Sequence, residues 1–140
     1  MPGGISDPLV GYATFAVVKF AGYCGAAMVL GTAYPAARAN SAVAGLTRTV
    51  IGLSVGAVYG TLVGLAFGAT LGAQSLLFFL AGLIPLRFCE WWLLIWLYYD
   101  RELTARGKGW RWATAGTAWS FVLDLPAIIG AIATAGFWIC

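Results

Sequence analysis

Four long apolar stretches make up most of this 140-residue chain and limit what it can fold into. They cover residues of about 10–33, 46–73, 76–99 and 112–137. An α-helix needs roughly 20 such residues to cross the hydrocarbon core of a bilayer. Charged residues are only 9% of the chain, against roughly a quarter in soluble proteins. The sequence therefore predicts an all-α polytopic membrane protein, a four-transmembrane-helix bundle that forms one integral membrane domain over residues 1–140.

The basic residues predict how such a bundle is oriented. Arg38 and Arg48 are assigned to the connection between the first two stretches, with Arg48 at the approximate start of the second, and a second basic group falls between the last two, formed by Arg101, Arg106, Lys108 and Arg111. Lys and Arg in short loops mark the cytoplasmic side of a membrane. The outer segments and the turn at Gln74 and Ser75 contain neither residue type. We therefore expect cytoplasmic basic loops, both termini outside, and a location in the bacterial inner (cytoplasmic) membrane.

A glycine recurs at every fourth position of the second stretch, and we call these residues the glycine ladder: Gly52, Gly56, Gly60, Gly64, Gly68 and Gly72. Each glycine costs a helix about 1 kcal/mol relative to alanine, so six of them need a compensating contact. In lipid, small residues let two helix backbones approach closely. A four-residue step rotates the ladder by about 40° each time, so one straight neighbour cannot cover it. The ladder predicts either packing within the chain or two partners, of which one is a neighbouring subunit.

Charged residues occur at one depth in the predicted spans. Lys19, Arg87, Glu90 and Asp124 each fall within about three residues of the middle of their stretch, close to the bilayer centre. A charge there costs about 2.5–3.5 kcal/mol on the insertion scale, so these side chains are expected to face inward and pair. Their charges sum to zero. The sequence predicts a neutral charged layer in the bundle interior.

Polar and helix-bending residues accompany the charged layer in the last two stretches. Thr117 and Ser120 lie on the same helix face as Asp124 and extend it as a polar stripe. Pro85 and Pro126 each lie two residues from a charged position, and a proline within a span frees carbonyl groups and permits a bend. The layer therefore has two interpretations: it lines a pathway or binding site for an ion or small polar solute, or it is a salt-bridge network that fixes helix register.

The composition argues against several classes of function. The chain has no histidine and only five acidic residues, and its three cysteines form no metal-binding spacing. No catalytic pair and no phosphate-binding loop are recognisable, so we expect neither an enzyme nor a cofactor or metal site. The net charge of +3 arises in loops rather than in a dense basic patch, which gives no reason to expect nucleic acid as a partner.

Two hypotheses of function follow from these features. The first is a small oligomeric channel or transporter, in which the charged layer serves an ion or a small polar solute. The second is an accessory or assembly subunit of a larger membrane complex, docked through the glycine ladder and the aromatic third stretch. Both place the chain in a lipid bilayer, with copies of itself or other membrane subunits as partners.

Overall fold

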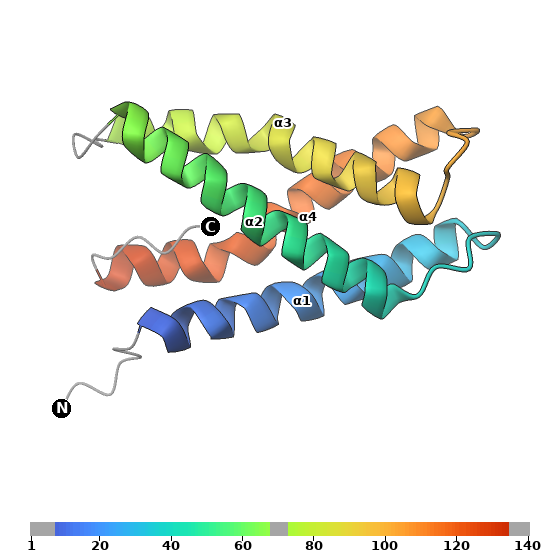
Figure 1. Ribbon diagram of the computed structural model, residues 1–140, viewed down its shortest axis with the longest axis horizontal. Coiled ribbons are helices and arrows are strands. Elements are labelled where there is room, and N and C mark those ends of the chain that lie inside the picture. Colours follow the sequence, from blue (N-terminus) through green and yellow to red (C-terminus); the bar gives the residue numbers. More distant parts are fainter. Residues whose placement is uncertain (1–7, 68–72, 135–140) are drawn as a thin grey trace.

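The computed structural model describes residues 8–67 and 73–134, and it contains four helices over these ranges. Side-chain surroundings are described for residues 11, 13–66 and 78–126. The helices are α1 (Pro8–Ala33), α2 (Ser41–Phe67), α3 (Ala73–Tyr98) and α4 (Arg106–Thr134) (Figure 1). The predicted all-helical architecture with four helices is confirmed.

Three of the helices are long and apolar enough to cross a membrane. The qualifying segments are Ala13–Ala33 in α1, Ser41–Ala66 in α2 and Phe78–Tyr98 in α3. The helix α4 is less apolar, because its first two turns contain Arg106, Lys108 and Arg111. The fold is thus that of a helical protein with three helices compatible with a membrane.

Two helices begin earlier than the apolar stretches suggest. The helix α2 starts at Ser41 rather than near residue 46, and α4 starts at Arg106 rather than near residue 112. Asn40 accounts for the first difference, because its side-chain oxygen accepts hydrogen bonds from the backbone N–H groups of Ala42 and Val43 at 2.9 and 3.4 Å. This is the N-cap geometry that satisfies the free N–H groups of a helix start. Capping rather than hydropathy sets where α2 begins.

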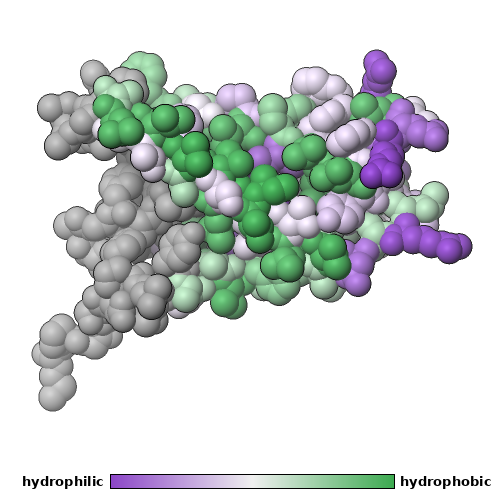
Figure 2. Space-filling model, viewed as in Figure 1, coloured by the Kyte–Doolittle hydropathy of each residue, from purple (hydrophilic) through white to green (hydrophobic). Residues whose placement is uncertain are grey.

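The helices pack as a ring in which each contacts its two neighbours. The contacting pairs are α1 with α2, α2 with α3, α3 with α4, and α4 with α1. The α1–α2 and α3–α4 loops lie at one end of the bundle, on the right in Figure 1. Figure 2 shows that the strongly hydrophilic residues on the visible face gather at this end, whereas the length of the helices is mostly apolar outside. Both basic loops therefore lie at the same end of the molecule, which we call the loop end.

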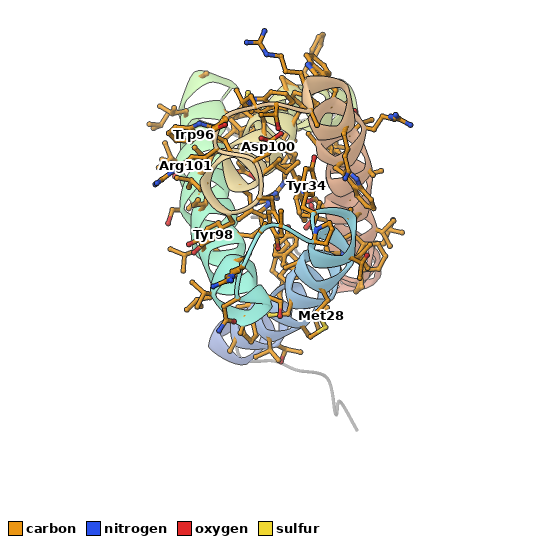
Figure 3. All side chains as sticks on the ribbon, turned by 90° about the vertical axis from the view of Figure 1, so that its right-hand side faces the viewer. Met28, Tyr34, Trp96, Tyr98, Asp100 and Arg101 are labelled. Carbon is orange, nitrogen blue, oxygen red and sulfur yellow. The ribbon has the colours of Figure 1, made fainter. Side chains whose placement is uncertain are left out.

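The bundle interior near the loop end is aromatic. Tyr23 and Trp91 meet edge to face at a centroid distance of 5.8 Å, and the Tyr99 hydroxyl donates to the carbonyl oxygen of Ala27 at 2.9 Å. Viewed onto the loop end in Figure 3, Tyr34 lies towards the bundle interior, whereas Trp96 points away from it. The Tyr23–Trp91 ring contact links α1 to α3 across the bundle, and the Tyr99 hydrogen bond links α1 to the residue that follows α3.

The loop between α3 and α4 is organised by Asp100. Its carboxylate accepts the backbone N–H groups of Ala105 and Thr104, both at 3.0 Å, and the Thr104 hydroxyl at 3.1 Å. These bonds favour the charged carboxylate, first through Ala105, and lower the pKa of Asp100. Leu103 in the same loop has a positive φ of 51°, a conformation that L-residues rarely adopt. The Asp100 bonds hold the chain in this tight turn.

The loop end is also closed by a contact between α4 and α1. The Lys108 ammonium donates to the carbonyl oxygen of Ala33, the last residue of α1, and lies 4.3 Å from the ring centroid of Tyr34. A cation at a helix C-terminus satisfies a free carbonyl and interacts favourably with the helix dipole. Lys108 therefore belongs to the folded bundle rather than to a solvated loop.

Candidate functional site: a buried charge cluster

Five charged side chains meet in the interior of the bundle, and every helix contributes at least one. We call them the charge cluster: Lys19 of α1, Arg48 of α2, Arg87 and Glu90 of α3, and Asp124 of α4. Their exposed fractions lie between 0% and 5%. The cluster includes all four residues of the predicted charged layer, which the structure brings together.

The ion pairs within the cluster are of two kinds. Lys19 binds Asp124 at 2.7 Å, and Arg48 binds Glu90 at 2.7 Å. Arg87 lies farther from its two carboxylates, at 3.4 Å from Glu90 and 3.5 Å from Asp124. Arg87 thus joins the two short pairs into one network but has no carboxylate of its own.

The expected position of Arg48 was wrong. The sequence places it in a cytoplasmic basic loop, but α2 begins at Ser41, so Arg48 lies about two turns inside the helix. Its side chain is fully buried and faces Glu90. Asn40 is the sequence signal that could have located it, because a helix started by this N-cap carries position 48 into the bundle.

The charge balance of the layer differs from the expected one for the same reason. With Arg48 included, the cluster has three cations and two anions, so its net charge is +1 when all five groups are ionised. The predicted layer of four charges was neutral. The five described side chains do not neutralise one another.

Aromatic rings enclose the Arg48 guanidinium group. Its central carbon lies 4.7 Å from the ring centroid of Tyr23 and 5.1 Å from that of Trp91. A cation close to the face of such a ring is attracted by the ring quadrupole, and desolvation strengthens the attraction. Tyr23 and Trp91 therefore stabilise a charge that burial would otherwise disfavour.

Ser120 connects this aromatic enclosure to the polar stripe of α4. Its hydroxyl oxygen accepts the indole N–H of Trp91 at 2.9 Å and Nη2 of Arg48 at 3.2 Å, and the Tyr23 hydroxyl donates to it at 3.4 Å. The Ser120 hydroxyl itself donates to the Gly116 carbonyl oxygen at 3.0 Å. One small side chain thus contacts three residues from three other helices.

Thr117, the other residue of the predicted stripe, is arranged differently. It is buried, but its hydroxyl donates to the carbonyl oxygen of Ala113 on its own helix at 2.8 Å. Such a bond satisfies a hydroxyl locally. Thr117 is therefore buried and hydrogen-bonded within α4, whereas Ser120 bonds directly to Arg48 of the cluster.

Several polar atoms of the cluster have no hydrogen-bond partner within the described part of the chain. These atoms are Nε and Nη1 of Arg48, Nε of Arg87, and Oε1 of Glu90, and none takes part in an ion pair. A buried donor or acceptor without a partner costs about 1–3 kcal/mol, and more when it is charged. The cluster thus retains unused hydrogen-bonding capacity, and three of the four atoms are donors.

The glycine ladder contacts the cluster at only one identified point. A Cβ atom at Gly52 would lie 2.8 Å from Nη1 of Arg48 and 3.1 Å from Nη1 of Arg87, so the lack of a side chain at Gly52 leaves room for both guanidinium groups beside α2. Gly56 is buried. Gly60 and Gly64 have no atom of the described chain within 4 Å of an added Cβ, and Gly68 and Gly72 lie outside the described residues. Different parts of the ladder therefore have different surroundings.

Close helix approach involves other glycines, which the four-residue spacing does not reveal. A Cβ at Gly45 would lie 2.5 Å from the Cys24 sulfur, and one at Gly82 would lie 2.0 Å from the Tyr59 hydroxyl. One at Gly116 would lie 2.3 Å from the Trp91 ring. Each of these glycines lies at a contact between neighbouring helices of the ring. Among the described residues, close packing thus involves single glycines outside the four-residue row as well as Gly52 within it.

Comparison with known protein families, curated proteins and solved structures finds no match to the chain.

Proposed function

We propose that this protein is a small oligomeric membrane channel or transporter, and that its charge cluster binds an ion or a small polar solute. The observation that carries this proposal is the buried network of five charged side chains, with unequal charges and unused hydrogen-bonding atoms. Ionisable side chains at membrane depth are expensive, and they commonly serve transport or binding.

The imbalance favours a binding role over a purely structural one. A salt-bridge network that only fixes helix register gains from being neutral and fully hydrogen-bonded, because each unmatched buried charge carries an uncompensated desolvation cost. This cluster has an excess cation and donors without partners. Both features are expected of a site whose remaining partner is a ligand.

Burial favours a transporter that passes through a closed state over a permanently open channel. All five charged side chains are at most 5% exposed, so a solute can reach them only after the helices have moved apart. Pro85 lies two residues before Arg87, and Pro126 lies two residues after Asp124. Prolines weaken the helix hydrogen-bond ladder, so we propose these positions as the points where α3 and α4 bend.

The proposal places all four helices across the membrane. The 29 residues of α4 extend about 43 Å at 1.5 Å per residue, which exceeds the roughly 30 Å hydrocarbon core. Its charged residue Asp124 pairs with Lys19 and so does not face lipid uncompensated. With the loop end carrying Arg38, Arg101 and Arg106, the positive-inside rule assigns that end to the cytoplasm and both termini to the outside. We propose the bacterial inner membrane as the location and assign no catalytic activity to the chain.

Flux through proteoliposomes tests the proposal. The full chain reconstituted in vesicles should carry protons, alkali cations or small anions above the rate of empty vesicles. Glu90→Gln should abolish this flux, because the variant removes the carboxylate that pairs with two arginines. Glu90→Asp, which keeps the charge but shortens the side chain, should reduce flux while preserving the folded protein.

The matched control is Glu102→Gln, the same change at an exposed loop position, which should leave the flux unchanged. Vesicles that stay tight to all three classes of ion, with correctly folded protein, would contradict the proposal. Equal loss of flux in the Glu102 and Glu90 variants would contradict the role of the cluster.

Two surfaces favour a second candidate, an accessory or assembly subunit of a larger membrane complex. No described atom lies within 4 Å of a Cβ added at Gly60 or Gly64, so these positions leave space for a helix of another subunit to pack closely. An apolar groove of about 640 Å³ runs along α3 and the start of α4, lined by Phe88, Cys89, Trp92, Leu93, Trp96, Leu103 and Trp110. The assembly mass in mild detergent discriminates the candidates: a multiple of the 14.7 kDa chain supports the transporter, and stoichiometric additional chains support the subunit.

A further inference from the structure

We propose that the charge cluster binds a small monovalent anion, held mainly by the Arg87 guanidinium group and assisted by Arg48 beside Gly52. This inference rests on the proposed function in that it names the ligand class of the same site. Three buried cations face only two buried carboxylates in this cluster.

The distances identify which cation lacks a counter-ion. Lys19 and Arg48 each have a carboxylate oxygen at 2.7 Å, which is the separation of a strong, charge-assisted pair. Arg87 has only the two longer contacts of 3.4 and 3.5 Å, and it shares both carboxylates with the better-placed cations. The uncompensated positive charge is therefore at Arg87.

Free donors are present on the same two arginines. Nε of Arg87, together with Nε and Nη1 of Arg48, has no hydrogen-bond partner in the described part of the chain, although both side chains are fully buried. The Nη1 atoms of both residues border the point where a Cβ of Gly52 would lie. Two like charges held this close repel each other, and an anion between or beside them removes that repulsion. Guanidinium groups supply only donors, so they suit an anion and not a cation.

The charge sets the class of ligand. An excess of one positive charge is neutralised by one monovalent anion, whereas a divalent anion would leave the cluster negative. The closed surroundings of the cluster and the absent side chain at Gly52 favour a compact ion such as chloride, bromide, fluoride or nitrate. Glu90 excludes the anion from its own side, because its carboxylate repels it.

Equilibrium binding of radiolabelled chloride to the purified full chain tests the inference, with bromide, fluoride, nitrate and gluconate as competitors at constant ionic strength. We expect saturable binding of one anion per chain, displaced by the small anions and not by gluconate. Gly52→Ala should weaken the binding by about tenfold or more, because its methyl group competes for the space beside both guanidinium groups. Arg87→Gln should abolish it, and Arg106→Gln, the same change at an exposed position, should leave it unchanged.

Arg87→Lys is a second variant that tests the same residue even if Arg87→Gln does not fold. It keeps the positive charge but lacks Nε and the planar set of donors. It should stay folded and bind chloride more weakly than the wild type. The inference is overturned if the wild type binds none of the four small anions. In that case the positive charge of the cluster would be removed by the loss of a proton instead. The inference is equally overturned if Gly52→Ala and Arg87→Lys both bind as the wild type does.

The flux assay separates this inference from the proposed function. If vesicles that contain the protein pass protons or alkali cations while the purified protein binds no anion, the inference is overturned and the proposed transport function is still supported. A protein that binds one chloride in vesicles tight to every ion would support the inference and contradict transport.

Discussion

At the scale of single residues, Ser120 shows how much of this interior depends on one hydroxyl group. It is the acceptor for Trp91 and Arg48, and both donors are fully buried. Ser120→Ala should leave the indole N–H without a partner and destabilise the bundle by about 1–3 kcal/mol. Thermal unfolding in detergent, followed by tryptophan fluorescence, measures the change.

Ser54→Ala is the matched control, because Ser54 is an exposed serine of α2. It should unfold at the wild-type temperature. If both serine variants behave like the wild type, water or another group replaces the Ser120 hydroxyl and the residue does not organise the site.

The expectation that the charged residues in the middle of the apolar stretches meet agrees with the structure. The free-energy cost of burying a charge without a partner is enough to predict this. A lysine or a carboxylate in the middle of an apolar stretch has little choice but to seek a partner, and Lys19, Arg87, Glu90 and Asp124 lie together. Arg48 was misplaced because an arginine near the end of a stretch can either reach water or turn inward. The choice depends on where the helix starts and on which rings face it, namely Tyr23 and Trp91. Neither is visible in the hydropathy of the chain.

At the scale of helices, Gly116 sets how closely α3 and α4 pack. A methyl group there would overlap the Trp91 ring, at 2.3 Å from its nearest atom, and a rigid indole cannot give way. Gly116→Ala should therefore lower the unfolding temperature and loosen the enclosure of Arg48. Gly107→Ala, in the same helix, meets nothing within 4 Å and should be neutral or slightly stabilising, because alanine favours helix by about 1 kcal/mol. Equal behaviour of the two variants would contradict the packing described for α4.

The loop between α3 and α4 should respond to acid through Asp100. Its pKa is lowered in the folded protein by the backbone N–H groups of Ala105 and Thr104. A lowered folded pKa means that the stabilisation is complete above the unfolded value of about 3.9 and is lost as the pH falls through the folded value. The unfolding temperature should therefore fall below about pH 4 by a smaller amount in Asp100→Asn than in the wild type. Parallel pH profiles for the two proteins would contradict this role.

Helix positions were more predictable than helix ends. The length of each apolar stretch locates its helix, and the end of α1 at Ala33 agrees with the stretch that closes before Pro35. The start of α2 depends instead on the Asn40 cap, and the residues directly before α4 are held by the carboxylate of Asp100. The glycine ladder was visible in the sequence, but which of its members meets a side chain depends on the crossing of the helices.

At the scale of the whole molecule, the open end of the glycine ladder should decide association. Gly64 faces no described atom within 4 Å, so Gly64→Leu should leave the fold of the single chain intact while blocking a neighbouring helix. We expect a smaller assembly mass in mild detergent, with unchanged helix content. Gly25→Leu, an equally open glycine of α1, should keep the wild-type mass. An unchanged mass for the Gly64 variant would contradict association through this face.

The ring order of the helices also has a consequence for biogenesis. Lys19 is in α1 and Asp124 is in α4, so the ribosome makes the ammonium group three helices before the carboxylate that pairs with it. Arg48 similarly precedes Glu90 by one helix. A lone charge is costly among acyl chains. For the membrane location proposed above, α1 therefore has to be retained until α4 has been made, and a chain that ends after α3 would contain a lysine without this counter-charge.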